Sequence, residues 1–274
     1  MKHVTWKAGL MFLLKLLFGL ALVVPLLYCL FISLMTTGEI FSYPPNLFPQ
    51  TLYLSNYEEL FRTIPVHRFL FNSLLIATVS TASKMILDSL AAYAFAFFEF
   101  KGKRLLFFGI LFAYMVPAEA IIIANVNTIA KLGLQDTMAA VLLPNLVSVI
   151  GVFIMRQRFL TIPKELREAA VLDGCGSFRF FASIALPVAQ SALFSLGMME
   201  FVSAWNMYLW PLLVTNSTAN RTIQIGISML NFSDSQSYGL CAAGIVAALI
   251  PPIIMFILGK RKLVEGLTAG AVKG

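Results

Sequence analysis

Long uninterrupted runs of apolar residues are the feature that most limits what this chain can fold into. A helix rises about 1.5 Å per residue, so roughly 20 mostly apolar residues cross the hydrocarbon core of a bilayer. Six segments meet this requirement, at about Leu10–Met35, Phe69–Phe98, Leu105–Ala124, Thr137–Met155, Pro187–Val214 and Tyr238–Leu258. Backbone groups left unpaired in lipid are costly, so such segments form helices. The sequence predicts an all-α, polytopic membrane protein with a six-helix transmembrane domain over residues 10–258.

The composition and the beginning of the chain agree with this fold class. Hydrophobic residues make up 59% of the chain and charged residues 12%, with a mean hydropathy of +0.85. The first apolar run continues to Leu34 without a small-residue cleavage site, which predicts a retained span rather than a signal peptide. The cysteines Cys29, Cys175 and Cys241 are far apart, so neither a disulfide framework nor a zinc site is indicated.

Lysine and arginine predict the orientation, because short cytoplasmic loops collect them. One side holds Lys2, Lys7, Lys101, Lys103, Arg104, Arg156, Arg158, Lys164, Arg167, Arg179, Lys260, Arg261 and Lys262, and the other holds Arg62, Arg68, Lys131 and Arg221. Both termini are therefore expected in the cytoplasm. The net charge of +7 follows this topology, which argues against a nucleic-acid partner.

The largest segment on the opposite side is residues 36–68, which is rich in proline and aromatic residues. A short amphipathic helix is predicted around Asn56–Phe61. Two roles stay open for this segment: packing on the membrane surface, or contact with an external partner.

The loop between the fourth and fifth spans carries a spaced motif. It reads Glu168-Ala169-Ala170, three residues, Gly174, nine residues, and then Ile184-Ala185-Leu186-Pro187. Thr161 and Pro163 suit the start of a helix over Lys164–Asp173, and Gly174 with Gly176 supplies the freedom to end it. A second short helix is predicted over Ser177–Ser183, and Pro187 is expected to start the fifth span. The prediction is a helix, a tight bend and a helix lying across the membrane face.

This pattern resembles the coupling loop of the permease subunits of bacterial ABC importers. The resemblance extends over nearly the whole chain and narrows to carbohydrate-uptake permeases similar to the smaller membrane subunit of the maltose importer. Two further stretches carry it, Trp205–Leu213 (WNMYLWPLL) and the tail Gly266–Gly274 (GLTAGAVKG). Cys175 and Gly176 depart from it, since the family commonly has alanine and serine there.

The resemblance implies a type I importer permease fold in the bacterial inner membrane. The core permease region would be residues 69–258. Within it, a cytoplasmic coupling loop at 160–186 would sit in a cleft of the ATPase subunit. A cytoplasmic tail at 259–274 would reach between the two ATPase subunits. In the coupling loop it implies that Glu168 pairs with an ATPase arginine, that Ala169 and Ala170 pack closely, and that Gly174 makes the bend. The coupling set is completed by Asp173, Ile184, Leu186 and Pro187. The alternative is an ordinary linker in which Glu168 pairs with Lys164.

The partners implied by the resemblance are a second, non-identical permease, two ATPase subunits and an extracellular solute-binding protein, with lipid around the spans. The chain contains no G-x-x-x-x-G-K-[ST] phosphate loop, so we expect it to bind no cofactor and the partner subunits to use ATP and Mg²⁺. His3 and His67 stand apart from any catalytic or metal-ligating set, and no enzymatic activity is expected.

The ionisable residues Lys84, Asp88, Glu119 and Glu200 lie within the predicted spans, where an unpaired charge is costly. Lys84 and Asp88 are four positions apart, which predicts an ion pair within one helix. Glu119 follows Pro117, which loosens the helix, and is predicted to line a translocation path together with Asn125.

The rest of the predicted path comes from the fifth span, where Glu200, Trp205, Asn206 and Tyr208 lie. Aromatic faces and amide groups suit the recognition of a sugar, although aromatic residues also collect at membrane interfaces.

Three functions remain open at this point. The first is import of a carbohydrate and the second is import of a glycerol phosphate or polyol phosphate. A phosphate favours cations along its path, but Lys84 alone lies deep in a span. Import of a carbohydrate is therefore preferred. The third is an ion-coupled secondary transporter with Asp88, Glu119 and Glu200 as ion sites.

Overall fold

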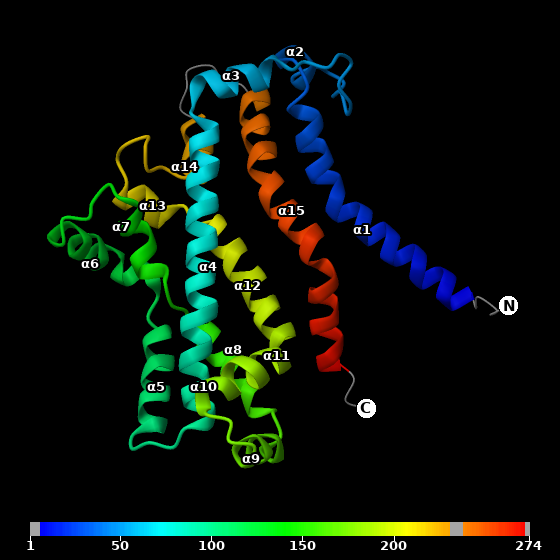
Figure 1. Cartoon of the computed structure of the whole chain (residues 1–274). Helices are drawn as coiled ribbons and strands as arrows, with labels where there is room; N and C mark the ends of the chain where they lie inside the picture. Colours follow the sequence, from blue (N-terminus) through cyan, green and yellow to red (C-terminus); the bar gives the residue numbers. More distant parts are fainter. Residues whose placement is uncertain (1–5, 231–237, 272–274) are drawn as a thin grey trace. The chain divides into compact units, whose positions relative to one another are not determined.

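The computed structural model describes residues 6–230 and 238–271, and in this part of the chain all regular secondary structure is helical, without strands (Figure 1). The all-α prediction is confirmed.

Two compact units are formed by Met1–His67 with Gly226–Ile250, and by Arg68–Ile225 with Pro251–Gly274; they are called unit 1 and unit 2. The helices are α1 (Trp6–Ile32), α2 (Thr37–Ile40), α3 (Ser55–Thr63), α4 (Val66–Phe97), α5 (Lys103–Tyr114), α6 (Ala118–Lys131), α7 (Met138–Leu142), η1 (Leu143–Asn145), α8 (Val149–Leu160), α9 (Lys164–Leu172), α10 (Ser177–Phe180), η2 (Phe181–Ala185), α11 (Leu186–Val188), α12 (Gln190–Trp205), α13 (Leu209–Val214), α14 (Ile223–Leu230) and α15 (Tyr238–Ala271).

Among the described residues, four stretches are long and apolar enough to cross a membrane singly: Gly9–Ile32, Val66–Phe97, Met138–Leu160 and Tyr238–Lys260. Two further pairs of helices qualify only together, α5 with α6 and the Ser177–Val188 stretch with α12. The described part of the chain thus has four candidate spans, or six if each bent pair counts as one.

The predicted span over Leu105–Ala124 is broken into two helices. Helices α5 and α6 meet at an angle of 95° across a break at residues 115–117. Pro117 has no N–H to donate and disfavours a helical backbone at the residue before it, which explains the break. Helix α5 alone, with 12 residues, is roughly 18 Å long and too short to cross the bilayer.

The fifth span begins close to the predicted Pro187, with α12 starting at Gln190. The second helix of the coupling loop does not stop at Ser183; it continues through a π-helical turn, η2, to Val188. Pro187 lies in the first turn of α11, where proline is tolerated. The chain then bends by 78° at Ala189. Helix α12 then ends at Trp205, and residues 206–208 separate it from α13.

In unit 1, the segment after α1 is ordered by buried polar side chains. The Asn56 amide donates to the carbonyls of Ser33 and Met35, at 3.0 and 2.9 Å. The carboxylate of Glu39 accepts hydrogen bonds from the backbone N–H groups of Thr36, Gln50 and Thr51, which lower its pKa below the usual value. The predicted amphipathic helix is present as α3.

In unit 2, a single carboxylate joins two loops. Asp136, which precedes α7, accepts hydrogen bonds from the backbone N–H groups of Ser217 and Asn216, both at 2.9 Å, and from the Ser217 hydroxyl at 3.0 Å. These donors lower the pKa of Asp136 to about 2. We call this arrangement the Asp136 clasp.

Candidate functional site

The predicted coupling loop, residues 160–186, begins with a helix whose end has a defined geometry. Helix α9 starts after Pro163, and its C-cap is Asp173. Gly174 follows with φ of 72°, in the left-handed region that glycine adopts most readily. The N–H of Gly174 donates to the Val171 carbonyl and that of Cys175 to the Ala170 carbonyl, at 3.0 and 2.8 Å, which together form a Schellman motif. The predicted bend is present at Gly174, whereas Gly176 is extended with φ of −68°.

The motif residues divide between a buried face and an exposed face. Ala170 is buried against a cluster that includes Phe180, Phe181 and Ala185. Ile184 and Leu186 are half-buried and pack on the same cluster. Glu168, Ala169, Asp173, Gly174 and Pro187 are exposed. One side of the motif therefore holds the loop in place, and the other is exposed.

Aromatic side chains anchor the loop to the ends of α4 and α8, and Figure 1 shows α9 and α10 close to the carboxyl end of α4. The ring of Tyr93 lies 5.1 Å from that of Phe181 and 6.2 Å from that of Phe159. The Tyr93 hydroxyl donates to the Ser177 carbonyl at 2.9 Å. Arg167 donates to the Phe97 carbonyl at 2.7 Å and lies over the Phe97 ring. These contacts make the loop and the two helix ends one packed body.

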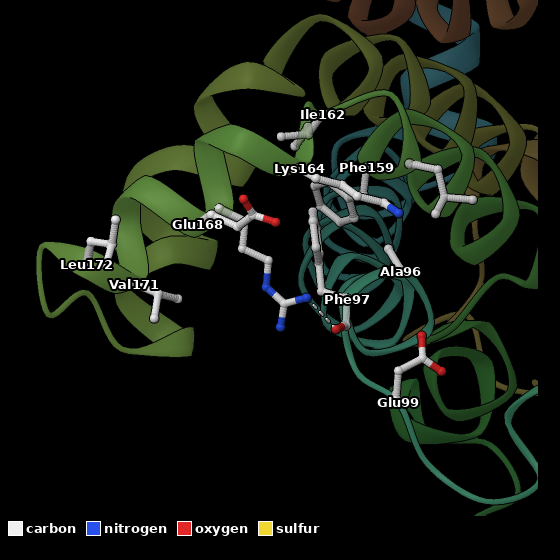
Figure 2. Close-up of a pocket in the computed structure, with 11 residues that line it drawn as sticks. Ala96, Phe97, Glu99, Phe159, Ile162, Lys164, Glu168, Val171 and Leu172 are labelled. Carbon is white, nitrogen blue, oxygen red and sulfur yellow. Dashed lines mark hydrogen bonds between the residues drawn. The ribbon is translucent and has the colours of Figure 1, made fainter.

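An open hollow of about 770 Å³ lies between α9 and the ends of α4 and α8. Figure 2 shows Phe97 and Phe159 on one side and Glu168 on the other, with Val171 and Leu172 farther along α9. Val171 and Leu172 are 63% and 89% exposed. The ion pairs found among the described residues do not include Lys164 with Glu168, the pair that an ordinary linker would have made.

The predicted ion pair between Lys84 and Asp88 is wrong. The Lys84 ammonium instead pairs with Glu200 on α12, with Nζ and Oε2 2.7 Å apart and both side chains buried. Asp88 Oδ1 accepts a hydrogen bond at 3.0 Å from the backbone N–H of Ser148, the N-cap residue of α8. Gly151 makes room for this carboxylate, because a Cβ at that position would overlap Asp88 Oδ2. The sequence analysis predicted neither the contact of Lys84 with Glu200 nor that of Asp88 with Ser148. The sequence indicated only that each buried charge needs a partner.

The six predicted path residues occupy different environments. Glu119 is exposed in the first turn of α6, and Asn125 is half-buried in the same helix. Glu200 is paired with Lys84, and Trp205 is 2% exposed and stacked on Phe201. The remaining two residues, Asn206 and Tyr208, lie in the break between α12 and α13. Tyr208 is 39% exposed, and the Asn206 side chain accepts a hydrogen bond from Gln224 at 3.4 Å.

Residues 9–261, nearly the whole chain, match the family described as the binding-protein-dependent transport system inner membrane component. This chain belongs to that family. It is an ABC importer permease component of the bacterial inner membrane, with several membrane-crossing helices.

Named relatives resemble this permease over most of their length. The sn-glycerol-3-phosphate transport system permease protein UgpE of Rhizobium meliloti (strain 1021) is 36% identical over 264 residues, 93% of this chain and 94% of the relative. The arabinooligosaccharides transport system permease protein AraQ of Halalkalibacterium halodurans is 35% identical over 227 residues, 82% and 81% of the two chains.

The fold of the permease is that of a solved importer. A chain from the crystal structure of a bacterial ABC transporter involved in the import of the acidic polysaccharide alginate superposes with a TM-score of 0.81 at 18% identity. The match covers 95% of this chain and 98% of the other. At this identity the likeness shows the fold alone.

Proposed function

We propose that this permease forms half of the translocation path of a carbohydrate importer and connects to an ATPase through residues 160–186. Its partners are a second permease, two ATPase subunits and an external binding protein. The observation that carries the proposal is the anchored coupling loop, which presents Glu168 and Ala169 outward from a body fixed to α4 and α8.

The coupling follows from rigidity. A partner that holds α9 moves the packed aromatic cluster as one body, because Tyr93 and Arg167 connect the loop directly to α4. The 78° bend at Ala189 then passes this movement to α12. Glu168 meets an arginine of the ATPase, while Val171 and Leu172 give an apolar contact. The permease has no catalytic role, and ATP with Mg²⁺ is used by the ATPase subunits.

The substrate is proposed to be a neutral sugar. A phosphate or carboxylate passing through the path needs a cation to replace its water, and Lys84 is the lysine or arginine that lies deep in α4. Its ammonium is already neutralised by Glu200 in a buried pair. Asn206 and Tyr208 instead offer neutral hydrogen-bonding and stacking groups at an exposed break.

A second candidate is import of a glycerol phosphate. The observation that favours it is the 36% identity with a permease named for sn-glycerol-3-phosphate.

The test is ATP hydrolysis and solute uptake by the reconstituted transporter with its binding protein, against a panel of sugars and glycerol phosphates. We expect one sugar to stimulate hydrolysis, and Glu168→Ala to lower uptake at least tenfold. Glu165→Ala, an exposed change on the same helix, is the matched control and should keep normal uptake.

The outcomes separate the competing functions. Normal uptake with Glu168→Ala refutes the coupling assignment, and stimulation by a glycerol phosphate alone refutes the sugar. Uptake that an uncoupler abolishes while ATP persists points to an ion-coupled transporter.

A further inference from the structure

A second hollow, of about 740 Å³, lies where α5 begins and is separate from the outward face of the coupling loop. Its lining combines one carboxylate, that of Glu99, with basic and apolar side chains, chiefly Lys103, Arg104, Leu105, Phe107, Phe108 and Arg156. None of these residues belongs to the proposed coupling set or translocation path. We call it the α5 hollow.

The α5 hollow carries positive charge that the described part of the chain does not neutralise. Lys103 is occupied, because its ammonium lies 3.0 Å from the Glu99 carboxylate and donates to the Phe98 carbonyl at 2.8 Å. Arg104 is exposed and makes no hydrogen bond or ion pair with the described residues. Arg156 has no carboxylate partner there. Two guanidinium groups are therefore available to an anion.

Arg156 is also held in a fixed position. Its guanidinium carbon lies 4.2 Å from the centre of the Phe107 ring, and its Nε donates to the Phe95 carbonyl at 3.3 Å. The Phe107 ring in turn stacks on that of Phe153, with 18° between the planes. A guanidinium oriented in this way loses little freedom when it binds an oxyanion, and arginine binds phosphate oxygens through two parallel hydrogen bonds.

An apolar strip starts beside these arginines and runs along α5. Leu105, Phe108 and Phe112 recur at helical spacing and are 78%, 54% and 67% exposed. Helix α5 belongs to a candidate span, so an exposed apolar strip on it suits contact with hydrocarbon. The α5 hollow thus has two guanidinium groups at one end and a surface for an acyl chain at the other.

We propose that the α5 hollow binds an anionic phospholipid. Arg104 and Arg156 hold the headgroup phosphate, and Leu105, Phe108 and Phe112 contact an acyl chain. Basic pockets at the ends of membrane helices bind anionic headgroups in this manner. A lipid uses both the charge and the apolar strip, whereas a soluble phosphate uses the charge alone.

The test measures lipid retention rather than transport, so its failure is distinct from failure of the proposed function. The intact transporter is reconstituted in nanodiscs of equimolar phosphatidylglycerol and phosphatidylcholine, and native mass spectrometry counts the retained lipids. We expect wild type to retain phosphatidylglycerol preferentially. Arg104→Gln should weaken this retention about tenfold, the effect of losing a charged hydrogen bond. Because Arg104 is exposed and unpartnered in the described residues, this change should not affect folding.

Two further variants complete the test. Lys131→Gln removes an exposed charge at the end of α6, away from the α5 hollow, and should retain lipid as wild type does. Arg156→Lys keeps the charge but loses the paired geometry, so retention should fall below that of wild type. Equal retention by wild type and Arg104→Gln overturns the proposal. Displacement of the lipid by millimolar inorganic phosphate also overturns it, in favour of a soluble anion.

Discussion

Asp88 lies four residues from Lys84 on α4, yet each side chain finds its partner on a different helix. A spacing of four residues on one helix allows two side chains to meet but does not ensure that they do. The start of α8 has backbone N–H groups without intrahelical acceptors, and the Ser148 N–H meets the Asp88 carboxylate. Lys84 then pairs with Glu200.

The pair between Lys84 and Glu200 yields a first prediction. Lys84→Met leaves a buried carboxylate without its cation, which should destabilise the protein by about 3–5 kcal/mol. A double variant with Glu200→Met removes both charges and should regain most of this stability. Thermal unfolding of the purified protein in detergent measures both effects. A double variant as unstable as Lys84→Met would contradict the pairing.

Gly151 yields a second prediction. A Cβ at this position overlaps the Asp88 carboxylate, so Gly151→Ala should lower stability by about 1–3 kcal/mol, the usual effect of overpacking. The control is Gly109→Ala on α5, where no atom lies within 4 Å of the added carbon. Unfolding midpoints compare the two, and equal midpoints would show that Asp88 is not held against α8.

At the scale of elements, the coupling loop depends on one left-handed residue. Gly174→Ala places a side chain at φ of 72°, which costs about 1–2 kcal/mol, and should reduce coupled uptake as the bend between α9 and α10 relaxes. Gly176→Ala is the matched control, since Gly176 has φ of −68° and open space around it. Uptake that falls equally in both variants would place the sensitivity elsewhere in the loop.

The Asp136 clasp predicts a pH dependence in the loop at residues 215–222. The carboxyl has a pKa of about 2, below its usual 3.8, so its stabilisation is complete above pH 3.8 and is lost as pH falls through 2. Amide exchange at Asn216 and Ser217, corrected for intrinsic rates, should therefore be constant from pH 7 to about 4 and rise below it.

The variant Asp136→Asn tests the clasp at neutral pH. Asparagine tolerates the positive φ of 56° at this position but is a weaker acceptor, so exchange should be fast even at pH 7. Unchanged exchange in Asp136→Asn would show that other contacts hold the loop.

Hydropathy and spacing predicted the elements that depend on local sequence alone. Helices α1, α4 and α15 follow from apolar runs, and α9 follows from its proline start and glycine end. The weak point at Pro117 was predicted, but the sizes of the bends at Pro117 and Ala189 were not, because the direction in which a chain turns depends on what packs against it. Lys84 and Glu200 were not paired in advance, since 116 residues separate them and no local pattern connects them.

At the scale of the whole molecule, the distribution of lysine and arginine predicts that the termini and the coupling loop face the cytoplasm. Tyr43 and Phe178, which are 97% and 74% exposed, report on the two sides when each is replaced by cysteine. Cys29, Cys175 and Cys241 are first changed to serine. A membrane-impermeant maleimide should label Tyr43→Cys in intact spheroplasts, and Phe178→Cys only after lysis. The reverse pattern would invert the topology.

Helix α1 differs from the other single spans in what its surface touches. No side chain from Gly9 to Ile32 is buried within this chain, whereas α4 buries residues along its length, among them Phe69, Ile76 and Ala92. Such a helix needs only sufficient length and hydrophobicity, so one aliphatic residue can replace another with little effect on the fold. At Gly151, by contrast, a single added carbon overlaps the Asp88 carboxylate. We therefore expect the amino-acid sequence to change quickly in evolution along α1 and slowly where α4 contacts α8.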